Sequence, residues 1–355
     1  MYNILYITNI AVPYRTDFFN QLSKKVNLTV LYERSKSKNR NSNWITSKKI
    51  EFKYFFLDGI KLGNEASFSF RIIKYILGKY DAIIVGCFNS PVEMFAILFM
   101  KIFKIKYYIN IDGEIFRPKN PFKRIIRNYF LKGAYGYFCA GVKSKQTLYS
   151  ITKSKNITCY KFSSMSEKSI KLASKQRNIG IQDEILVVGQ YEEYKGLDIA
   201  AQVARINPDL KFKFIGMNKK KEKFERYLRK NDIHNIKVIP FLTVAELQKE
   251  YINCKVLVLP SRQECWGLVV NEGAAFGIPI VSTTGSGAAC DFLDGEYEQF
   301  LAKPNDVQDL SEKIKHVLSL SEQQRKQYAI YLQKKAIEYT IEENVESYIK
   351  GLGII

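Results

Sequence analysis

Two glutamates eight positions apart, Glu264 and Glu272, are the residues of this sequence with the clearest chemical potential. An apolar run before them predicts a buried strand, and a helix is expected to begin near Gly267. The free N–H groups at this helix start, around Trp266, Gly267 and Leu268, suit a bound diphosphate. Glu272 would then accept hydrogen bonds from a ribose diol, and Glu264 from sugar hydroxyls. The alternative is a surface helix with two acidic residues near its N-terminus, which the accompanying order of Pro, Ser, Glu and Gly residues disfavours.

This segment resembles the Glu-x7-Glu signature of retaining glycosyltransferases of the family 4 type, which have the two-Rossmann GT-B fold. The resemblance continues upstream, where the family usually reads Gly-Arg, a short gap and Lys-Gly, and this chain reads Gly189-Gln190 and Lys195-Gly196. The glycine-rich stretch 283–291 is similar to the family's turn after a later strand. Gln190 stands where arginine is usual, so a diphosphate must rely more on Lys195 and on the helix start.

The resemblance implies a retaining transfer of a hexosyl or N-acetylhexosaminyl group from a nucleotide-sugar donor, for which a UDP-sugar is expected. By it, Lys195 stabilises charge on the departing diphosphate, Glu272 binds the ribose and Glu264 orients the donor sugar. The bulky residues Arg262 and Trp266 are expected to shape the donor pocket. The other residues expected to bind the donor are Gly189, Gln190, Gly267 and Leu268.

The first half of the chain resembles bacterial capsule and lipopolysaccharide transferases in the stretch 8–19. That resemblance implies an acceptor-side loop and helix containing Pro13, Tyr14 and Arg15. Many family members carry a histidine after a central strand, near the reacting sugar, and this chain has Asp112 there. Asp112 is therefore a candidate catalytic residue, and its alternative role is a carboxylate that caps the loop after the strand.

Neither a metal site nor a resident cofactor is expected. Asp112 and Glu114 resemble a D-x-D pair, but the fold implied by the resemblance stabilises its leaving diphosphate with cations and helix dipoles. The six cysteines form no C-x-x-C pair and there are only two histidines, so a zinc site has poor prospects. Reduced, mostly buried thiols are the expected state of the cysteines.

Strand-like and helix-like segments alternate along the chain, which predicts an α/β protein with two doubly wound, Rossmann-like domains facing a central cleft. We expect an acceptor-binding domain over residues 1–168, a polar linker over 168–183 and a nucleotide-sugar-binding domain over 184–335. The segment 336–355 is expected to return as a helix to the first domain.

The expected strands are Ile4–Thr8, Leu28–Tyr32, Lys53–Leu57, Ala82–Gly86, Lys106–Ile111, Tyr137–Ala140, Glu184–Val188, Lys211–Ile215, Lys237–Pro240, Val256–Pro260 and Ile278–Ser282. The expected helices include Arg15–Lys25, Phe68–Leu77, Pro91–Phe103, Phe122–Leu131, Lys221–Lys230 and Val244–Tyr251.

Positive charge is concentrated in the first half. Of a formal net charge of +20, residues 1–170 contribute 29 Lys and Arg against 10 Asp and Glu, whereas residues 171–355 contribute 26 against 25. A compositional bias towards lysine would affect both halves alike, so the first half is predicted to meet a polyanion: an anionic membrane, a phosphorylated acceptor or nucleic acid. The stretches Phe68–Tyr80 and Arg117–Lys132 combine apolar and basic residues and favour the membrane. A buried helix face with solvated basic rims would explain either stretch alone.

We therefore expect Lys123, Arg124 and Arg127 to face an anionic membrane, and the acceptor to be a membrane-associated glycan linked to a polyprenyl diphosphate. The chain opens without a recognisable signal peptide, and lysines interrupt its most apolar stretch, 94–109, so a cytoplasmic protein at the inner face of the membrane is expected. The oligomeric state is not predicted. The alternatives are a GT-B-fold sugar-nucleotide epimerase, a soluble polysaccharide synthase and a nucleic-acid-binding protein, although no recognised nucleic-acid motif is present.

Overall fold

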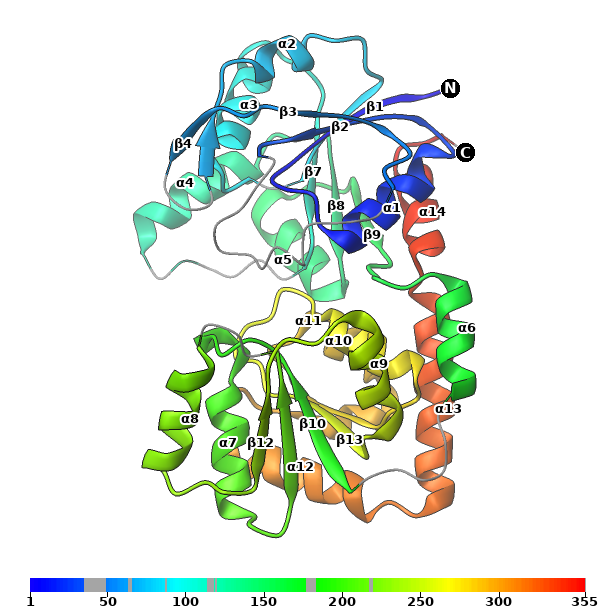
Figure 1. Cartoon of the computed structure of the whole chain (residues 1–355). Helices are drawn as coiled ribbons and strands as arrows, with labels where there is room; N and C mark the ends of the chain where they lie inside the picture. The colour runs from blue at the N-terminus through cyan, green and yellow to red at the C-terminus, as the bar shows by residue number, and fades with distance from the viewer. Residues whose placement is uncertain are drawn as a thin grey trace. The chain divides into compact units, whose positions relative to one another are not determined.

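The computed structural model describes residues 1–34, 49–62, 66–86, 88–113, 118, 120–176, 183–216 and 220–354. The chain divides into two compact units (Figure 1). The first unit combines Met1–Ser164 with Ile341–Ile355, and the second consists of Met165–Thr340. Glu114, Arg117 and Lys119, which entered the expectations for a metal pair and a membrane surface, lie outside the described residues.

The first unit is built on a seven-stranded sheet in the order β3-β2-β1-β6-β7-β8-β9, and every neighbouring pair in it is parallel. Its elements are β1 (Asn3–Thr8), α1 (Pro13–Ser23), β2 (Asn27–Tyr32), β3 (Lys53–Phe56), β4 (Ile60–Leu62), β5 (Ala66–Phe68), α2 (Ile72–Ile76), β6 (Ala82–Val85), α3 (Pro91–Ile102), β7 (Tyr108–Ile111), α4 (Pro121–Leu131), β8 (Gly136–Ala140), α5 (Val142–Thr152), β9 (Ile157–Tyr160) and α14 (Ile341–Gly351). β4 and β5 form a separate antiparallel hairpin.

Both faces of this sheet are covered, which is why its central strands β6, β7 and β8 are buried along their whole length instead of alternating. On β1, Leu5 and Ile7 point into a core that also contains Val92 from α3. Tyr6 points to the opposite face, where its ring meets that of Phe19 from α1 at 4.8 Å. The expected doubly wound arrangement is thereby confirmed for this unit.

The C-terminal helix α14 completes the first unit by packing on α1 and β9. The Tyr348 ring lies parallel to that of Phe138 with 4.3 Å between centroids, and its hydroxyl donates a hydrogen bond to Asn110 Oδ1. The returning segment begins at Ile341 and not at residue 336, because helix α13 (Glu322–Glu338) continues to Glu338 within the second unit.

The second unit repeats the plan with a six-stranded sheet in the order β12-β11-β10-β13-β14-β15, again parallel throughout. Its other elements are α6 (Glu167–Gln176), β10 (Glu184–Val188), the 3-10 helix η2 (Glu193–Lys195), α7 (Leu197–Ile206), β11 (Lys211–Ile215), α8 (Lys221–Lys230), β12 (Ile236–Ile239), α9 (Val244–Asn253), β13 (Val256–Leu259), α10 (Leu268–Ala275), β14 (Ile280–Thr283), α11 (Gly287–Phe292), η3 (Gly295–Phe300), β15 (Leu301–Ala302) and α12 (Val307–Ser319). The strand order reverses between β10 and β13, and such switch points are where open α/β sheets bind ligands.

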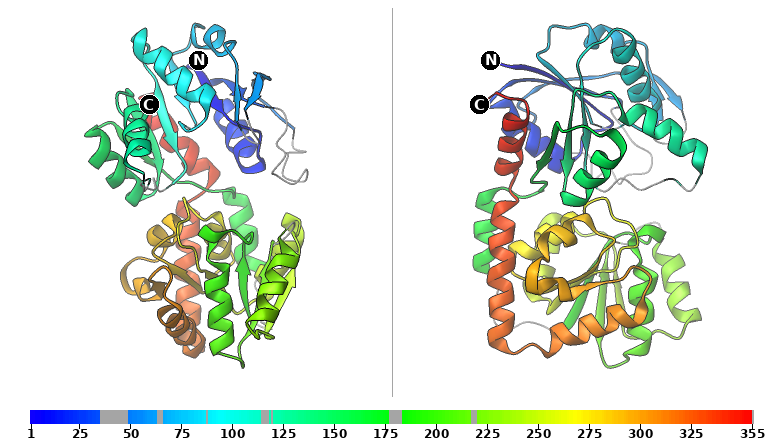
Figure 2. Two further views of the ribbon diagram at one scale, coloured as in Figure 1. Left: turned by 90° about the vertical axis from the view of Figure 1, so that its left-hand side faces the viewer. Right: turned by 180° about the vertical axis from the view of Figure 1, so that it is seen from behind.

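Two expectations about local structure were wrong. The stretch expected to be a linker contains α6, whose Ile170 and Ala173 are buried and which lies beside α13 (Figures 1 and 2). Because most residues of α6 are charged or polar, its short apolar face was not recognised as a helical pattern. The helix expected over Phe68–Leu77 is the single turn α2, because Phe68 ends the β5 strand.

Candidate active site

The loops that follow β10 and β13 meet at the switch point of the second sheet. Lys195, the last residue of η2, forms an ion pair with Glu264 from the loop after β13. Both side chains are largely enclosed, with 17% and 12% of their surface exposed. Ser261 Oγ donates a further hydrogen bond of 3.3 Å to Glu264 Oε2. The structure therefore brings together the two residues that the sequence placed at the diphosphate and the donor sugar.

The contact between Lys195 and Glu264 depends on a close approach of the two loop backbones, which also explains the glycine after Lys195. Gly196 has φ of +66°, and a Cβ atom there would lie 2.0 Å from the Pro260 carbonyl oxygen. Only glycine combines this left-handed conformation with so short an approach. The Lys-Gly pair therefore has a geometric reason. The glycine allows the loop to contact the end of β13, and the lysine side chain extends to Glu264.

Arg262 ties the same two loops together from the other side. Its Nη1 and Nη2 atoms donate hydrogen bonds of 2.7 and 2.6 Å to the two carboxylate oxygens of Asp198, and Nη1 also donates to the Glu193 carbonyl at 2.6 Å. The Asp198 carboxylate raises the pKa of Arg262. The guanidinium is therefore engaged in positioning the loops, which differs from the expected role in shaping the donor pocket.

The Glu264 loop rests on the glycine-rich turn after β14, as the backbone N–H of Glu264 donates to the Gly285 carbonyl at 2.7 Å. Gly267, which precedes α10, has φ of +103°, and a Cβ atom there would lie 2.9 Å from Ser286 Oγ. A glycine at this position has no side chain to cap the helix, so the first-turn N–H groups from Leu268 onward are suited to a ligand anion. The expected helix start is confirmed within one residue.

Glu272 lies on α10, about 6 Å along the helix axis from Leu268. Its Oε2 accepts a hydrogen bond of 2.8 Å from the hydroxyl of Tyr251 on α9. Tyr251 is 2% exposed, and burial together with the charge of Glu272 raises its pKa well above the usual value. The hydroxyl thus stays protonated and acts as a fixed donor that orients one carboxylate oxygen of the half-buried Glu272.

Trp266 does not line an open pocket, contrary to the expectation. It is 2% exposed, its Nε1 donates to Asn271 Oδ1 at 2.9 Å, and its ring stacks on that of Tyr339 at 5.8 Å. An indole in this loop serves to anchor it in the core. Gln190 is exposed and Gly189 is half-buried at the end of β10, so both remain accessible at the edge where Lys195 lies.

On the first unit, the predicted acceptor residue Arg15 is buried in a polar network. Its Nη1 donates to the Tyr6 hydroxyl at 2.6 Å, and its Nη2 forms an ion pair with Asp112. Asp112 also accepts hydrogen bonds from Asn110 at 2.8 Å and from Tyr160 at 2.7 Å. These three donors hold Asp112 in a network of side chains. Its catalytic role and the alternative role of capping the loop after β7 both stay predictions.

Pro13 is the first residue of α1 and is half-buried, as is Tyr14, whose ring meets that of Phe162 at 5.7 Å. This places both at the start of α1, next to the buried Arg15, where the sheet of the first unit has its carboxyl edge. Their contact with an acceptor stays a prediction.

The two stretches expected to touch a membrane differ in structure. In Phe68–Tyr80, the short helix α2 buries Ile72 and Ile76 in the core, which agrees with the alternative explanation for that part, whereas Phe70 and Leu77 are 67% and 63% exposed. In α4, by contrast, Leu131 is the only buried residue, while Lys123 and Arg124 are exposed and Arg127 is half-buried.

A second group of titratable residues lies at the carboxyl edge of the first sheet. The Ser90 hydroxyl contacts a carboxylate oxygen of Glu33 and lies 3.0 Å from Glu93 Oε2, and both glutamates are buried. Burial raises the pKa of Glu33 to about 7. Because one hydroxyl has one proton to donate, this arrangement favours a proton on one of the two carboxyl groups.

Within the described residues, no three or more His, Cys, Asp or Glu side chains are grouped so as to hold a metal ion. The D-x-D-like pair considered above consists of Asp112 and Glu114, and Glu114 lies outside the described residues. Over the same described part of the chain, no helix is both long and apolar enough to cross a bilayer.

Asp198 and Tyr251 are site residues that the sequence analysis did not identify. The signal for Asp198 was its place in the first turn of the helix after Lys195-Gly196, where an acidic residue is ordinary. Tyr251 lies 21 positions before its partner, and its sequence surroundings contain nothing that distinguishes it from a core tyrosine.

Comparison with known proteins supports the fold and the domain that carries this site. Residues 170–335, a little under half of the chain, match the sequence profile of the family described as Glycosyl transferases group 1. An uncharacterized glycosyltransferase of Methanocaldococcus jannaschii is 34% identical over 137 residues, which cover 39% of this chain and 38% of that protein. The matched region thus spans well under half the length of that relative.

Solved structures match over almost the whole chain. Sucrose-phosphate synthase from Thermosynechococcus elongatus has a TM-score of 0.76 at 13% identity, covering 99% of this chain and 98% of its own. HepE from Anabaena, in complex with UDP, has a TM-score of 0.72 at 14% identity, covering 99% and 100%. At this identity the likeness shows the fold, which is that of the GT-B glycosyltransferases. The chain therefore has two Rossmann-like units of GT-B type, and its residues 170–335 are similar to the family described as Glycosyl transferases group 1.

Proposed function

We propose that this protein is a retaining glycosyltransferase that moves a sugar from a nucleotide-sugar donor to a membrane-associated glycan. The observation that carries the proposal is the enclosed Lys195–Glu264 ion pair at the switch point of the second sheet, inside a Glycosyl transferases group 1 domain. That UDP is bound by HepE, a protein of the same fold, favours a UDP-sugar as the donor.

The ion pair suggests how the site is kept ready for the donor. Without a donor, Lys195 and Glu264 neutralise each other, so neither charge is left uncompensated in a largely enclosed place. An incoming diphosphate competes for Lys195 and releases a Glu264 oxygen to accept hydrogen bonds from sugar hydroxyls. Lys195 and the start of α10 then stabilise the charge that grows on the diphosphate as it leaves the anomeric carbon.

The remaining residues position the side chains that would bind the donor. Arg262 and Asp198 hold the loops that carry Lys195 and Glu264, and Tyr251 orients Glu272 for the ribose. The proposed transfer uses no metal ion and no resident cofactor, since side-chain cations and helix N–H groups would supply the positive potential. The acceptor is proposed to be a lipid-linked glycan, because the excess of basic residues lies in the first half of the chain.

A thermal-shift screen across UDP-, GDP- and ADP-sugars tests the donor part directly, since a ligand that binds the folded state raises its melting temperature. The donor so identified is then incubated with Glu272→Ala, in which donor binding should weaken by about 1.5–3 kcal/mol, the range for hydrogen bonds to a charged group. Unchanged donor affinity in a folded Glu272→Ala protein would refute the assignment.

Product analysis separates the alternatives. A transferase releases a nucleoside diphosphate and makes a glycosylated acceptor, whereas an epimerase changes the sugar with or without an acceptor. Activity on a soluble glycan in the absence of any lipid would favour the soluble polysaccharide synthase.

A further inference from the structure

Helix α4 presents a row of apolar side chains to the surface of the first unit. Phe122, Ile125 and Tyr129 are 68%, 66% and 51% exposed, and Ile126 between them is 36% exposed. Their spacing of three, four and seven residues puts all four on one face of the helix. These four residues are named here the α4 stripe. A continuous exposed apolar row of this kind marks a surface that binds something.

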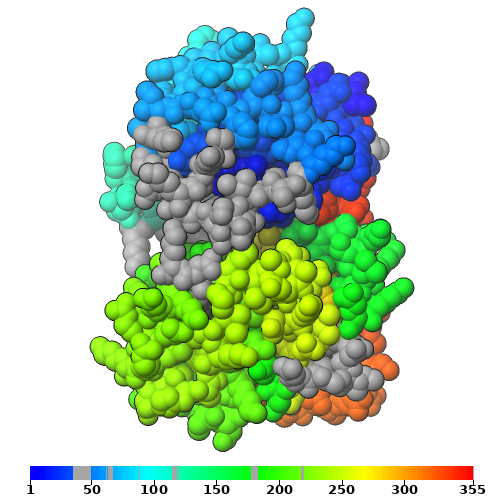
Figure 3. Space-filling view, in the orientation of Figure 1, coloured from blue at the N-terminus to red at the C-terminus, as the bar shows by residue number. Residues whose placement is uncertain are grey.

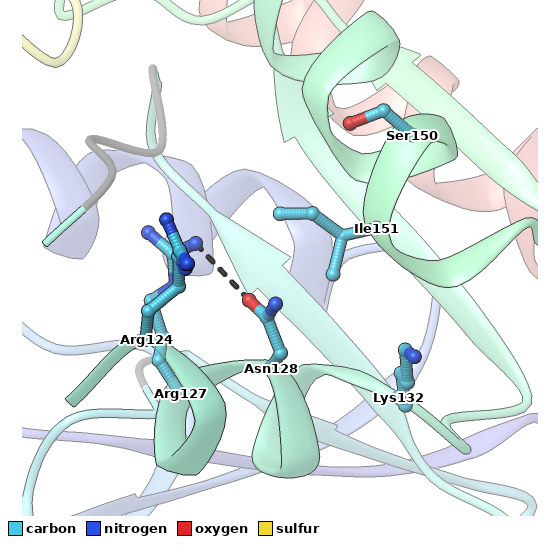
Figure 4. A pocket seen from close by; sticks show the side chains of 6 residues that line it. All are labelled: Arg124, Arg127, Asn128, Lys132, Ser150 and Ile151. Atoms are coloured by element: carbon cyan, nitrogen blue, oxygen red, sulfur yellow. Dashed lines mark hydrogen bonds between the residues drawn. The ribbon is translucent and has the colours of Figure 1, made fainter. Parts of the chain in front are cut away.

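The opposite face of α4 shows which way the stripe points. Arg124, Arg127 and Asn128 turn towards α5 and line a pocket of about 330 Å³ together with Ser150 and Ile151 (Figure 4). Arg127 Nη2 donates a hydrogen bond of 3.1 Å to Asn128 Oδ1 within it. Since this face is turned to the body of the unit, the α4 stripe is turned away from it. Of the three basic residues predicted at the membrane, Lys123 therefore lies nearest to the stripe's flank.

The segment of the sequence that carries the α4 stripe has charges of one sign. Residues 120–166 contain nine Lys and Arg and not one Asp or Glu. At the neighbouring end of α3, the Lys101 ammonium lies 4.1 Å from the centre of the Tyr129 ring and donates to the Tyr129 carbonyl. An apolar row on a segment that carries basic and no acidic residues is complementary to an anionic interface with an apolar interior.

We propose that the α4 stripe is the surface by which this protein docks on a bilayer containing anionic lipid. Phe122, Ile125 and Tyr129 enter the boundary between headgroups and acyl chains, with Ile126 at its edge, while Lys101 and Lys123 stay at the level of the lipid phosphates. This deepens the proposed function, on which it rests for the presence of an acceptor at the membrane, by identifying the docking helix and the partner surface.

The electrostatic and the apolar contributions to membrane binding can be measured separately. Each basic residue near an anionic surface strengthens partitioning by about fivefold, and this factor declines with salt over a Debye length of roughly 8 Å at physiological ionic strength. Each inserted large apolar side chain adds about tenfold, which salt does not weaken. Binding should hence be reversible, selective for anionic lipid and dependent on both kinds of residue.

The test is flotation of the full chain with vesicles of phosphatidylcholine alone or mixed with phosphatidylglycerol, at low and high salt. The protein should float only with the anionic vesicles and less at high salt. Phe122→Ser together with Ile125→Ser should reduce partitioning by at least tenfold, and Lys123→Ala by about fivefold. The side chains removed are mostly exposed, so the variants should fold, which circular dichroism checks.

Matched controls remove the same chemistry from the second unit. Val244→Ser at the start of α9 removes a side chain that is 77% exposed. Lys223→Ala removes an exposed charge from α8, which lies on the surface of that unit (Figure 3). Both controls should partition as the unchanged protein does. An Ile125→Trp variant should also show blue-shifted emission and quenching by brominated lipid when anionic vesicles are added.

Three results would overturn the proposal: no flotation with anionic vesicles at low salt, equal binding of the Phe122/Ile125 double variant and the Val244→Ser control, or concentration-dependent dimerisation abolished by the double variant. The last would assign the stripe to a second copy of the chain. The assay contains no nucleotide sugar, so these results leave the proposed sugar transfer to be judged by its own experiment.

Discussion

Tyr251→Phe removes a single oxygen atom beside Glu272, at the proposed donor site, and tests whether Glu272 must be oriented. The hydroxyl donates at 2.8 Å to Glu272 Oε2 and belongs to a side chain that is 2% exposed. The phenylalanine ring keeps the packing on Phe276, whose ring lies 5.6 Å away. Only the hydrogen bond is lost, so a change in donor binding can be attributed to Glu272.

The magnitude follows from the surroundings of the bond. A hydrogen bond to a charged group contributes about 1.5–3 kcal/mol, and because Glu272 is half-buried, water can partly replace the lost donor. We therefore expect a loss near the lower end, about 1.5 kcal/mol. If the freed carboxylate no longer faces the ribose, the dissociation constant of the nucleotide sugar rises about tenfold.

Isothermal titration with the nucleotide sugar measures this directly, and Tyr328→Phe is the matched control. Tyr328 is also fully buried in the second unit and donates at 2.7 Å, but its acceptor is the Ile280 carbonyl on β14. Tyr328→Phe should lower the free energy of unfolding by about 1 kcal/mol and leave donor affinity as it is. If both variants bind the donor equally well, the argument that Tyr251 orients Glu272 fails.

Three further predictions address the loops and the buried carboxylates. Lys195→Ala should reduce turnover by orders of magnitude, whereas EDTA should leave the unchanged enzyme nearly as active. Activity that is lost in EDTA and restored by manganese or magnesium would show that a metal ion stabilises the leaving diphosphate. Asp198→Ala should lower the free energy of unfolding by about 1–2 kcal/mol and reduce turnover, because Arg262 no longer holds the two loops together. Asp198→Glu should recover part of the stability and part of the turnover. Activity of the alanine variant equal to that of the unchanged protein would contradict the positioning role. Burial raises the pKa of Glu33 from 4.5 to about 7, so the folded protein binds this proton more tightly than the unfolded chain does, and stability should fall by up to about 3 kcal/mol as the pH rises from 4.5 through 7. Glu33→Gln should flatten this dependence in melting curves recorded across that range, and an unaltered profile would show that Glu33 does not carry it.

Local patterns were enough to predict the fold class because parallel strands buried on both faces are apolar along their whole length. Three of the elements in the second unit, β10, β11 and α8, have the bounds that the sequence predicted. The expectation failed where apolar residues were few, as in α6, and where a strand and a helix follow each other closely, as around Phe68. In both places the element is defined by what it packs against.

For the site, the sequence by itself was enough to predict which residues would carry the chemistry: the spacing of Glu264 and Glu272, the Lys-Gly pair and the glycine before α10 are local patterns of loop and helix start. Only the tertiary structure decided their partners. Arg262 and Trp266 were expected at the donor pocket, yet one is bound by Asp198 and the other is buried on Tyr339. Side chains of these types serve a ligand or the protein equally well, and the choice depends on contacts between residues dozens of positions apart, which no local pattern specifies.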